Sequence, residues 1–114
     1  MRLAIAYENG EVCQHFGETP SYLLVDIENG KAVNETIHDN GGASHAELVN
    51  VLASLNVNAI ICGGIGSMAF TLLTLAEIKV YASYVGSAEQ AENDFLAGKL
   101  SIAKTATHEC SCHH

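Results

Sequence analysis

The feature that most constrains the fold is a change in the spacing of apolar residues near residue 40. Before it, the continuous apolar run from Leu3 to Ala6 is typical of a strand buried on both faces. Asn29-Gly30 is a strong hairpin signal between the predicted strands 22–27 and 32–38. After it, apolar residues recur every three or four positions, which indicates helices. The resulting order β-β-β-α-β-α-β-α predicts an α/β fold with a mixed sheet.

Three helices are predicted after the change in spacing, separated by short apolar strands. The first and the third each begin with a capping box, in which a serine is followed three residues later by Glu or Gln. The third also ends at a glycine, as helices often do. The helices are expected over Ser44 to Leu55, Ala69 to Ala76 and Ser87 to Gly98, and the strands over 59–62 and 80–82.

The sheet is expected to have five strands in the spatial order 3-2-1-4-5, with strand 2 antiparallel to the others. A strand–helix–strand passage in one sheet is nearly always a right-handed crossover, which limits the possible arrangements. This order is taken by analogy with ribonuclease-H-like folds. One domain is expected over residues 1–100, followed by a tail rich in cysteine and histidine over residues 101–114.

Composition narrows the classes of partner. A chain of 114 residues with 48% hydrophobic residues can bury a core without metal or disulfide support. Five Lys and Arg against 13 Asp and Glu, a net charge of −8, disfavour nucleic acid and anionic membranes as partners. No signal peptide or membrane-spanning stretch is recognised, so a cytoplasmic protein is expected. In a reducing compartment, four cysteines point to metal or redox chemistry rather than to disulfides.

Soft metal ligands occur at two places in the chain. Cys13 and His15 flank Gln14 in an early loop, and the last seven residues are mostly thiols and imidazoles. Thiolate and imidazole together select zinc, copper or iron–sulfur centres over magnesium and calcium. Cys62 ends a buried strand and is interpreted as a core residue. The predicted metal ligands are Cys13, His15, Cys110, Cys112, His113 and His114.

Several candidate groups are expected to meet at one edge of the sheet. In the expected strand order, the loops that leave strands 1, 3 and 4 reach the same edge, where ligands bind in open α/β sheets. The turn 63–66 has three glycines before a helix, so its amides can approach an anion closely. The tail, about a dozen residues long, can either cross the domain to this edge or bind metal separately. The predicted binding residues are Cys13, His15, His45, Gly63, Gly64, Ile65 and Gly66.

Three short motifs together resemble a known family. They are His15-Phe16-Gly17, Gly41-Gly42 with His45, and Gly63-Gly64-Ile65-Gly66 with Ala69 and Leu73. The chain resembles the dinitrogenase iron–molybdenum cofactor biosynthesis family from Met1 to about Leu100. Two positions depart from the family pattern: Glu77 stands where a glycine is usual, and Cys13 is not required.

The resemblance implies a ribonuclease-H-like fold and a carrier role. The cargo would be a metal–sulfur cluster containing iron, molybdenum or both, or a precursor of it. It implies donor and acceptor proteins of cofactor assembly as partners, anaerobic organisms as the usual source, and no established catalysis. His15, His45 and the glycine turn match the family's histidines and glycine loop.

Two other functions stay open from the residues themselves. One is a simple zinc or copper binder or sensor that uses only the tail. The other is a nuclease of the ribonuclease-H type, which needs several inward carboxylates on magnesium. Strand 1 has no carboxylate before Glu8, and Asp26 alone lies within strand 2, so the nuclease is disfavoured.

Overall fold

A computed structural model describes residues 1–41 and 45–103, with only the backbone at His45. The expected cap Ser44 and the tail ligands Cys110, Cys112, His113 and His114 lie outside the described residues. The elements along the chain are β1 (Arg2–Glu8), β2 (Glu11–Val12), the short 3-10 helix η1 (Phe16–Glu18), β3 (Ser21–Glu28), β4 (Lys31–Asp39), α1 (His45–Ser54), β5 (Ala59–Ile61), α2 (Ser67–Leu75), β6 (Lys79–Tyr81) and α3 (Ala88–Leu96).

The strands form one mixed sheet in the order β4-β3-β1-β5-β6, and β2 pairs with β1. β3 is antiparallel to both β1 and β4, while β1, β5 and β6 are parallel. By chain segment, the main path is the one expected from the sequence. The expected count of five strands was wrong, because β2 is a sixth strand, and its presence changes the numbering from 3-2-1-4-5 to 4-3-1-5-6. The ribonuclease-H-like label stays a prediction.

The additional strand arises from a second Asn-Gly hairpin. Asn9 and Gly10 have φ values of +50° and +85°, close to +54° and +77° at Asn29 and Gly30. Positive φ at both central residues is the geometry of the tight hairpin turn that Asn-Gly favours. The turn pairs Tyr7 with Val12, so the chain folds back along the end of β1.

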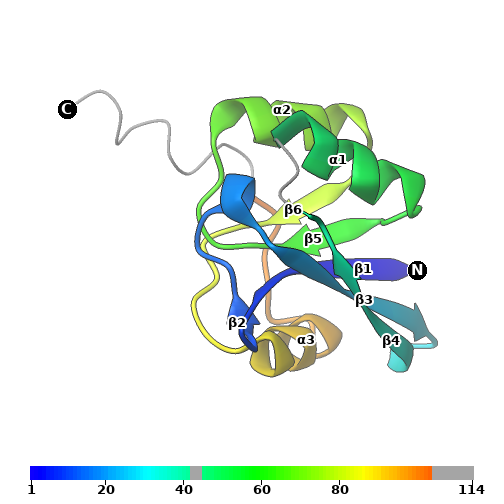
Figure 1. The fold of residues 1–114 in the computed structure, drawn as a ribbon. Coiled ribbons are helices and arrows are strands. Elements are labelled where there is room, and N and C mark those ends of the chain that lie inside the picture. Colours follow the sequence, from blue (N-terminus) through cyan, green and yellow to red (C-terminus); the bar gives the residue numbers. More distant parts are fainter. Residues whose placement is uncertain (42–44, 104–114) are drawn as a thin grey trace.

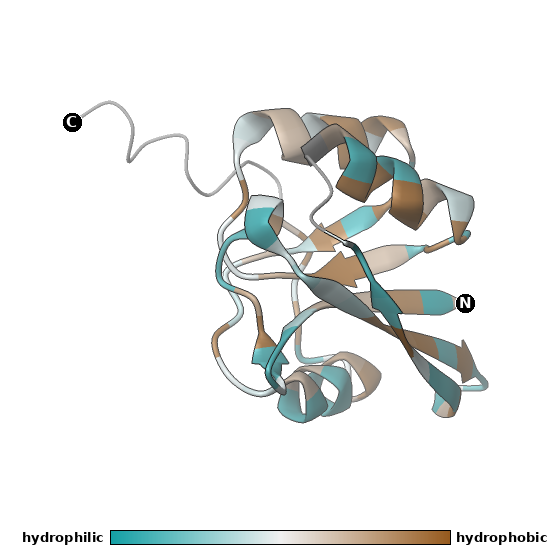
Figure 2. Ribbon diagram, in the orientation of Figure 1, coloured by the Kyte–Doolittle hydropathy of each residue, from teal (hydrophilic) through white to brown (hydrophobic). Residues whose placement is uncertain are grey.

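Two layers of helices enclose the sheet. Figure 1 shows α1 and α2 on one face and α3 on the other. Alternate residues of β1 enter different cores: Ala4 and Ala6 pack on the α1 and α2 side, and Leu3 and Ile5 on the α3 side. In Figure 2, β5 is coloured as hydrophobic while the edge strand β4 is mostly hydrophilic. The apolar run in β1 therefore reflects burial on both faces, as predicted.

The third predicted helix has the expected cap. The amide of Gln90 donates to Oγ of Ser87 at 3.0 Å. Gly98, just after the helix, has a φ of +73°.

Among the described residues, no helix is long and apolar enough to cross a membrane.

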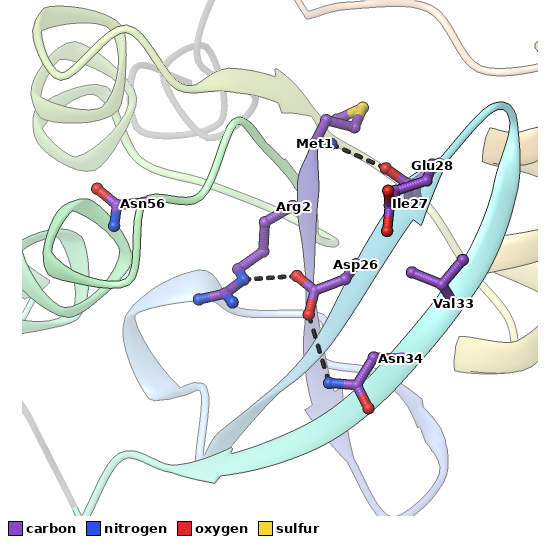
Figure 3. A pocket seen from close by; sticks show the side chains of 8 residues that line it. All are labelled: Met1, Arg2, Asp26, Ile27, Glu28, Val33, Asn34 and Asn56. Carbon is purple, nitrogen blue, oxygen red and sulfur yellow. Dashed lines mark hydrogen bonds and ion pairs between the residues drawn. The ribbon is translucent and has the colours of Figure 1, made fainter.

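Hydrogen bonds connect neighbouring strands around a pocket at the edge of the sheet where β1 begins. In Figure 3, Arg2, Asp26 and Asn34 point toward one another. Nε of Arg2 lies 2.7 Å from Oδ1 of Asp26, and Nη1 of Arg2 donates to the carbonyl of Leu55 at 2.7 Å. The hydrogen bond from Arg2 lowers the pKa of Asp26. These contacts tie β1, β3, β4 and the end of α1 together at the edge opposite the predicted site.

Candidate functional site

Three loops meet at the carboxyl ends of β1, β5 and β6, on the left of Figure 1. The amide of Gly63 donates to the carbonyl of Cys13 at 3.0 Å, and that of Gly64 to the carbonyl of Gln14 at 2.7 Å. The carbonyl of Gly64 in turn accepts from the amide of Phe16 at 3.0 Å, and His15 and Gly64 form a parallel bridge. The structure thus brings the loop that carries Cys13 and His15 directly onto the glycine turn.

Gly63 is required by this close approach. A Cβ atom at this position would lie 2.5 Å from Cα of Gln14 and 2.9 Å from the carbonyl oxygens of Cys13 and Gln14. No side chain fits at those distances without a backbone shift. The amides of Gly63 and Gly64 are engaged in the bonds between the loops. These two amides are therefore not available for the anion contacts that were expected of them. Such contacts would come instead from the amides at the start of α2.

The start of α2 offers such contacts. Gly66 is its N-cap residue, with an extended backbone and no hydrogen bond from a capping side chain. The first amides of a helix have no acceptor within the helix, and the helix dipole makes this end positive. Ile65, in contrast, is 1% exposed and belongs to the core. The glycine turn therefore has two parts, one that binds the neighbouring loop and one that opens a helix.

Cys13 is a core residue in this structure, although it was predicted as a metal ligand in a loop. It is 3% exposed, and its thiol donates to the carbonyl of His15 at 3.3 Å. Burial raises the pKa of the Cys13 thiol. This effect is larger than the lowering of the pKa by hydrogen bonds with the His15 backbone and the Thr19 side chain. The thiolate form needed for metal ligation is thus disfavoured.

Cys62 lies in the same core cluster as Cys13, in agreement with its interpretation as a buried hydrophobic residue. Burial, with a smaller effect from the nearby Cys13, raises its pKa to about 12. Both residues are free cysteines. Two buried, protonated thiols are typical of structural rather than reactive cysteines.

His15 is exposed at the rim formed by these loops. It immediately precedes η1, which is anchored by Phe16, 1% exposed, with its ring centroid 6.4 Å from that of Tyr22. The buried hydroxyl of Thr19 donates to the carbonyl of Phe16 at 2.7 Å and closes the turn. A buried aromatic residue and a buried hydroxyl thus fix the backbone from which His15 projects.

The loop 82–87, after β6, is a part of the rim that sequence reasoning missed. The amide of Ser83 donates to the carbonyl of Gly63 at 2.8 Å. Nε2 of the exposed Gln14 donates to the carbonyls of Val12 and Tyr84, at 2.9 and 3.0 Å. The parallel orientation of β6 was the available signal, since it brings the end of this strand to the same edge as those of β1 and β5.

His45 begins α1, and its side chain lies outside what the structure describes. The chain that leads to it starts beside η1, because Asn40 donates from its backbone to the carbonyl of Pro20 and from its side chain to that of Thr19. Its role as a binding residue stays a prediction.

The described residues contain no ready-made chelating site. Within 1–41 and 45–103, no group of three or more His, Cys, Asp or Glu side chains is arranged to hold a metal ion. The rim instead combines one exposed imidazole, loop backbone and a helix N-terminus.

Known proteins share this architecture. A curated relative, the uncharacterized protein MJ0580 of Methanocaldococcus jannaschii, is 31% identical over 105 residues, which cover 88% of this chain and 89% of that protein. The crystal structure of PH0822 has 27% identity and a TM-score of 0.83, covering 91% of this chain and 96% of that one. The apo form of the orange protein from Desulfovibrio gigas has 25% identity and a TM-score of 0.82, covering 93% and 95%.

A third similar structure is that of a putative NifB protein from Thermotoga, with 26% identity and a TM-score of 0.75, covering 95% of this chain and 97% of that one. The family described as dinitrogenase iron-molybdenum cofactor matches residues 1–98. That match spans every helix and strand that the structure describes. The chain therefore belongs to the dinitrogenase iron–molybdenum cofactor family.

Proposed function

We propose that this protein binds and carries, or scaffolds, a metal–sulfur cluster of the iron–molybdenum type, or a precursor of it, during cofactor assembly. Family membership supports the class of cargo. The observation that carries the site assignment is the bridge between His15 and Gly64, which brings an exposed histidine next to the turn that opens α2. We assign no catalytic step to the protein.

The chemistry of the rim suits an anionic cluster. Backbone amides at a helix N-terminus attract negative charge, and an imidazole can ligate a metal or donate a hydrogen bond to a sulfide. These local donors are needed because a net charge of −8 repels an anion at long range. The cargo would therefore be held by short-range contacts to a surface that is already assembled.

Cys13 has a different role in this proposal from the one predicted. Its thiol donates to the carbonyl of His15, so it holds the loop backbone from inside the core. His15 is then the primary contact, and Cys13 positions it. The tail ligands Cys110, Cys112, His113 and His114 and the helix residue His45 remain proposed additional contacts.

Anaerobic reconstitution tests the proposal. The full chain is incubated with ferrous iron, molybdate and sulfide, desalted, and analysed for bound metal, sulfide and visible absorption. His15→Ala should lose most of the bound cluster, whereas His38→Ala, a histidine of β4, should behave as wild type. Equal uptake by both variants would remove His15 from the site.

A deletion distinguishes the carrier from a metal binder that uses only the tail. Removal of residues 108–114 should leave most cluster binding in place if the rim holds the cargo. Loss of all binding in the deletion, with full binding in His15→Ala, would favour the zinc or copper binder instead.

A further inference from the structure

α3 carries a buried acid that the proposed function does not use. Glu92 is 9% exposed, and its helix packs Ala88 and Ala91 into the core on that side of the sheet. A carboxylate is rarely buried to this extent unless a charge partner or a proton compensates it. The environment of Glu92 shows which of the two applies.

The group that faces Glu92 is another acid. Glu35, on the edge strand β4, lines the same cavity as Glu92, and Glu89 adds a further negative charge from the first turn of α3. These three acids, with Tyr7 from β1, line a cavity of ≈ 370 Å³ between α3 and the sheet, and no lysine or arginine lines it. Neighbouring carboxyl groups without a cation between them favour a state in which one of them keeps its proton.

Glu92 therefore titrates in the neutral range. Burial is the largest cause, and Glu35 adds to it, raising the pKa of Glu92 to about 7. Since the folded state holds the proton of Glu92 more tightly than the unfolded chain, the resulting stabilisation is complete below the unfolded pKa near 4.5. It is lost as the pH rises through about 7.

α3 is connected to the rim of the candidate site by backbone bonds. The amide of Ala88 donates to the carbonyl of Gly10, and the amide of Val12 to the carbonyl of Gly86, both at 3.0 Å. Ser87, the cap of α3, forms an antiparallel bridge with Glu11. The start of α3 and the loop 82–87 are therefore paired with the hairpin that leads into Cys13 and His15.

We propose that the cavity lined by Glu35, Glu89 and Glu92 is a pH-sensitive latch, in which a protonated Glu92 holds α3 to the sheet and thereby keeps the loop 82–87 in place at the rim. Below neutral pH Glu92 keeps its proton, and α3 stays packed on the sheet. Above neutral pH two adjacent carboxylates repel each other, α3 loosens from the sheet, and the rim loses the support of the loop. The latch acts through the scaffold and does not require the cargo to be a metal–sulfur cluster.

Urea unfolding at pH 5.5 and pH 8.5 tests the latch. For a pKa of about 7 folded and 4.5 unfolded, the folding equilibrium constant of wild type should fall about 30-fold between these pH values. Glu92→Gln should reduce this fall to less than about 3-fold, because no titrating group remains at residue 92. The matched control Glu89→Gln, an exposed position on the same helix, should keep most of it.

A second variant covers the case in which Glu92→Gln does not fold. Glu35 is exposed on an edge strand, so Glu35→Gln should fold, and it should reduce the pH dependence in part, because the contribution of Glu35 is removed while Glu92 stays buried. A wild type that is equally stable at both pH values overturns the latch. So does a fall that persists undiminished in Glu35→Gln.

Hydrogen exchange locates the effect. After correction for intrinsic rates, amides of α3 and of residues 82–87 should lose protection at pH 8.5, whereas amides of β5 should not. A uniform loss over the whole sheet, or unchanged protection in α3, would contradict a latch at this position.

Discussion

Gly63→Ala tests the crossing of the two loops that builds the candidate rim. The added methyl group would lie 2.5 Å from Cα of Gln14 and 2.9 Å from two carbonyl oxygens, so the backbones must separate. Separation weakens the hydrogen bonds from Gly63 to Cys13 and from Gly64 to Gln14. Two such bonds contribute about 1 kcal/mol each, and overpacking costs about 1–3 kcal/mol. Together these give an expected loss of about 3–5 kcal/mol in the free energy of unfolding.

The assay is urea unfolding followed by circular dichroism, with Gly66→Ala as the matched control. A Cβ atom at Gly66 would meet no atom within 4 Å, and its φ of −79° suits any residue. This control should lose about 1 kcal/mol or less, the difference between glycine and alanine at a helix N-cap, because the added methyl group meets no other atom. Equal stability of Gly63→Ala and Gly66→Ala would refute the steric argument for the glycine turn.

Three further substitutions test other parts of the fold. Glu77 has a φ of +62°, so Glu77→Gly should stabilise the protein by about 0.5–1 kcal/mol in the same assay, and a loss of stability would show that no strain is present. Ser87→Ala should cost about 1 kcal/mol through loss of the α3 cap, and an unchanged midpoint would contradict the capping role. A variant with both tail cysteines replaced by serine leaves only Cys13 and Cys62 to react with a thiol-reactive disulfide. At pH 8 they should react much more slowly in the folded protein than in urea, because both thiols are buried and their pKa values are raised. Rapid labelling of folded protein would place them at the surface.

The elements that the sequence predicted well are those with strong local signals. Asn29-Gly30 sets the hairpin between β3 and β4, and the Ser87 cap with Gly98 sets the ends of α3. β2 was missed although Asn9-Gly10 is the same dipeptide, because a strand of two residues has no alternation to detect.

The candidate site was harder to predict because it depends on contacts between segments distant in sequence. The convergence of the early loop and the glycine turn followed from the expected strand order. Whether the side chain of Cys13 points into the core did not follow, since a loop has no periodicity that assigns its faces. The roles of Gly63 and Gly64 were likewise set by the approach of Cys13 and Gln14, which only the folded chain shows.

The acid pair was not predicted for the same reason. Glu89 and Glu92 are both acidic residues of α3, and nothing local in the sequence distinguishes the exposed Glu89 from the buried Glu92. Glu92 lines a cavity between α3 and the sheet together with Glu35, which lies more than 50 residues earlier in the chain. A helical pattern in sequence identifies the inner face only when that face is apolar.

The most direct test of the carrier account is the amount of cluster bound after anaerobic reconstitution of wild type, His15→Ala and His38→Ala in parallel. The account predicts bound iron, molybdenum and sulfide, with a visible absorption band, in wild type and His38→Ala. In His15→Ala it predicts the loss of most of the bound metal and sulfide and of most of the absorption. Wild-type protein that takes up no metal or sulfide, or His15→Ala that takes up as much as wild type, would contradict it.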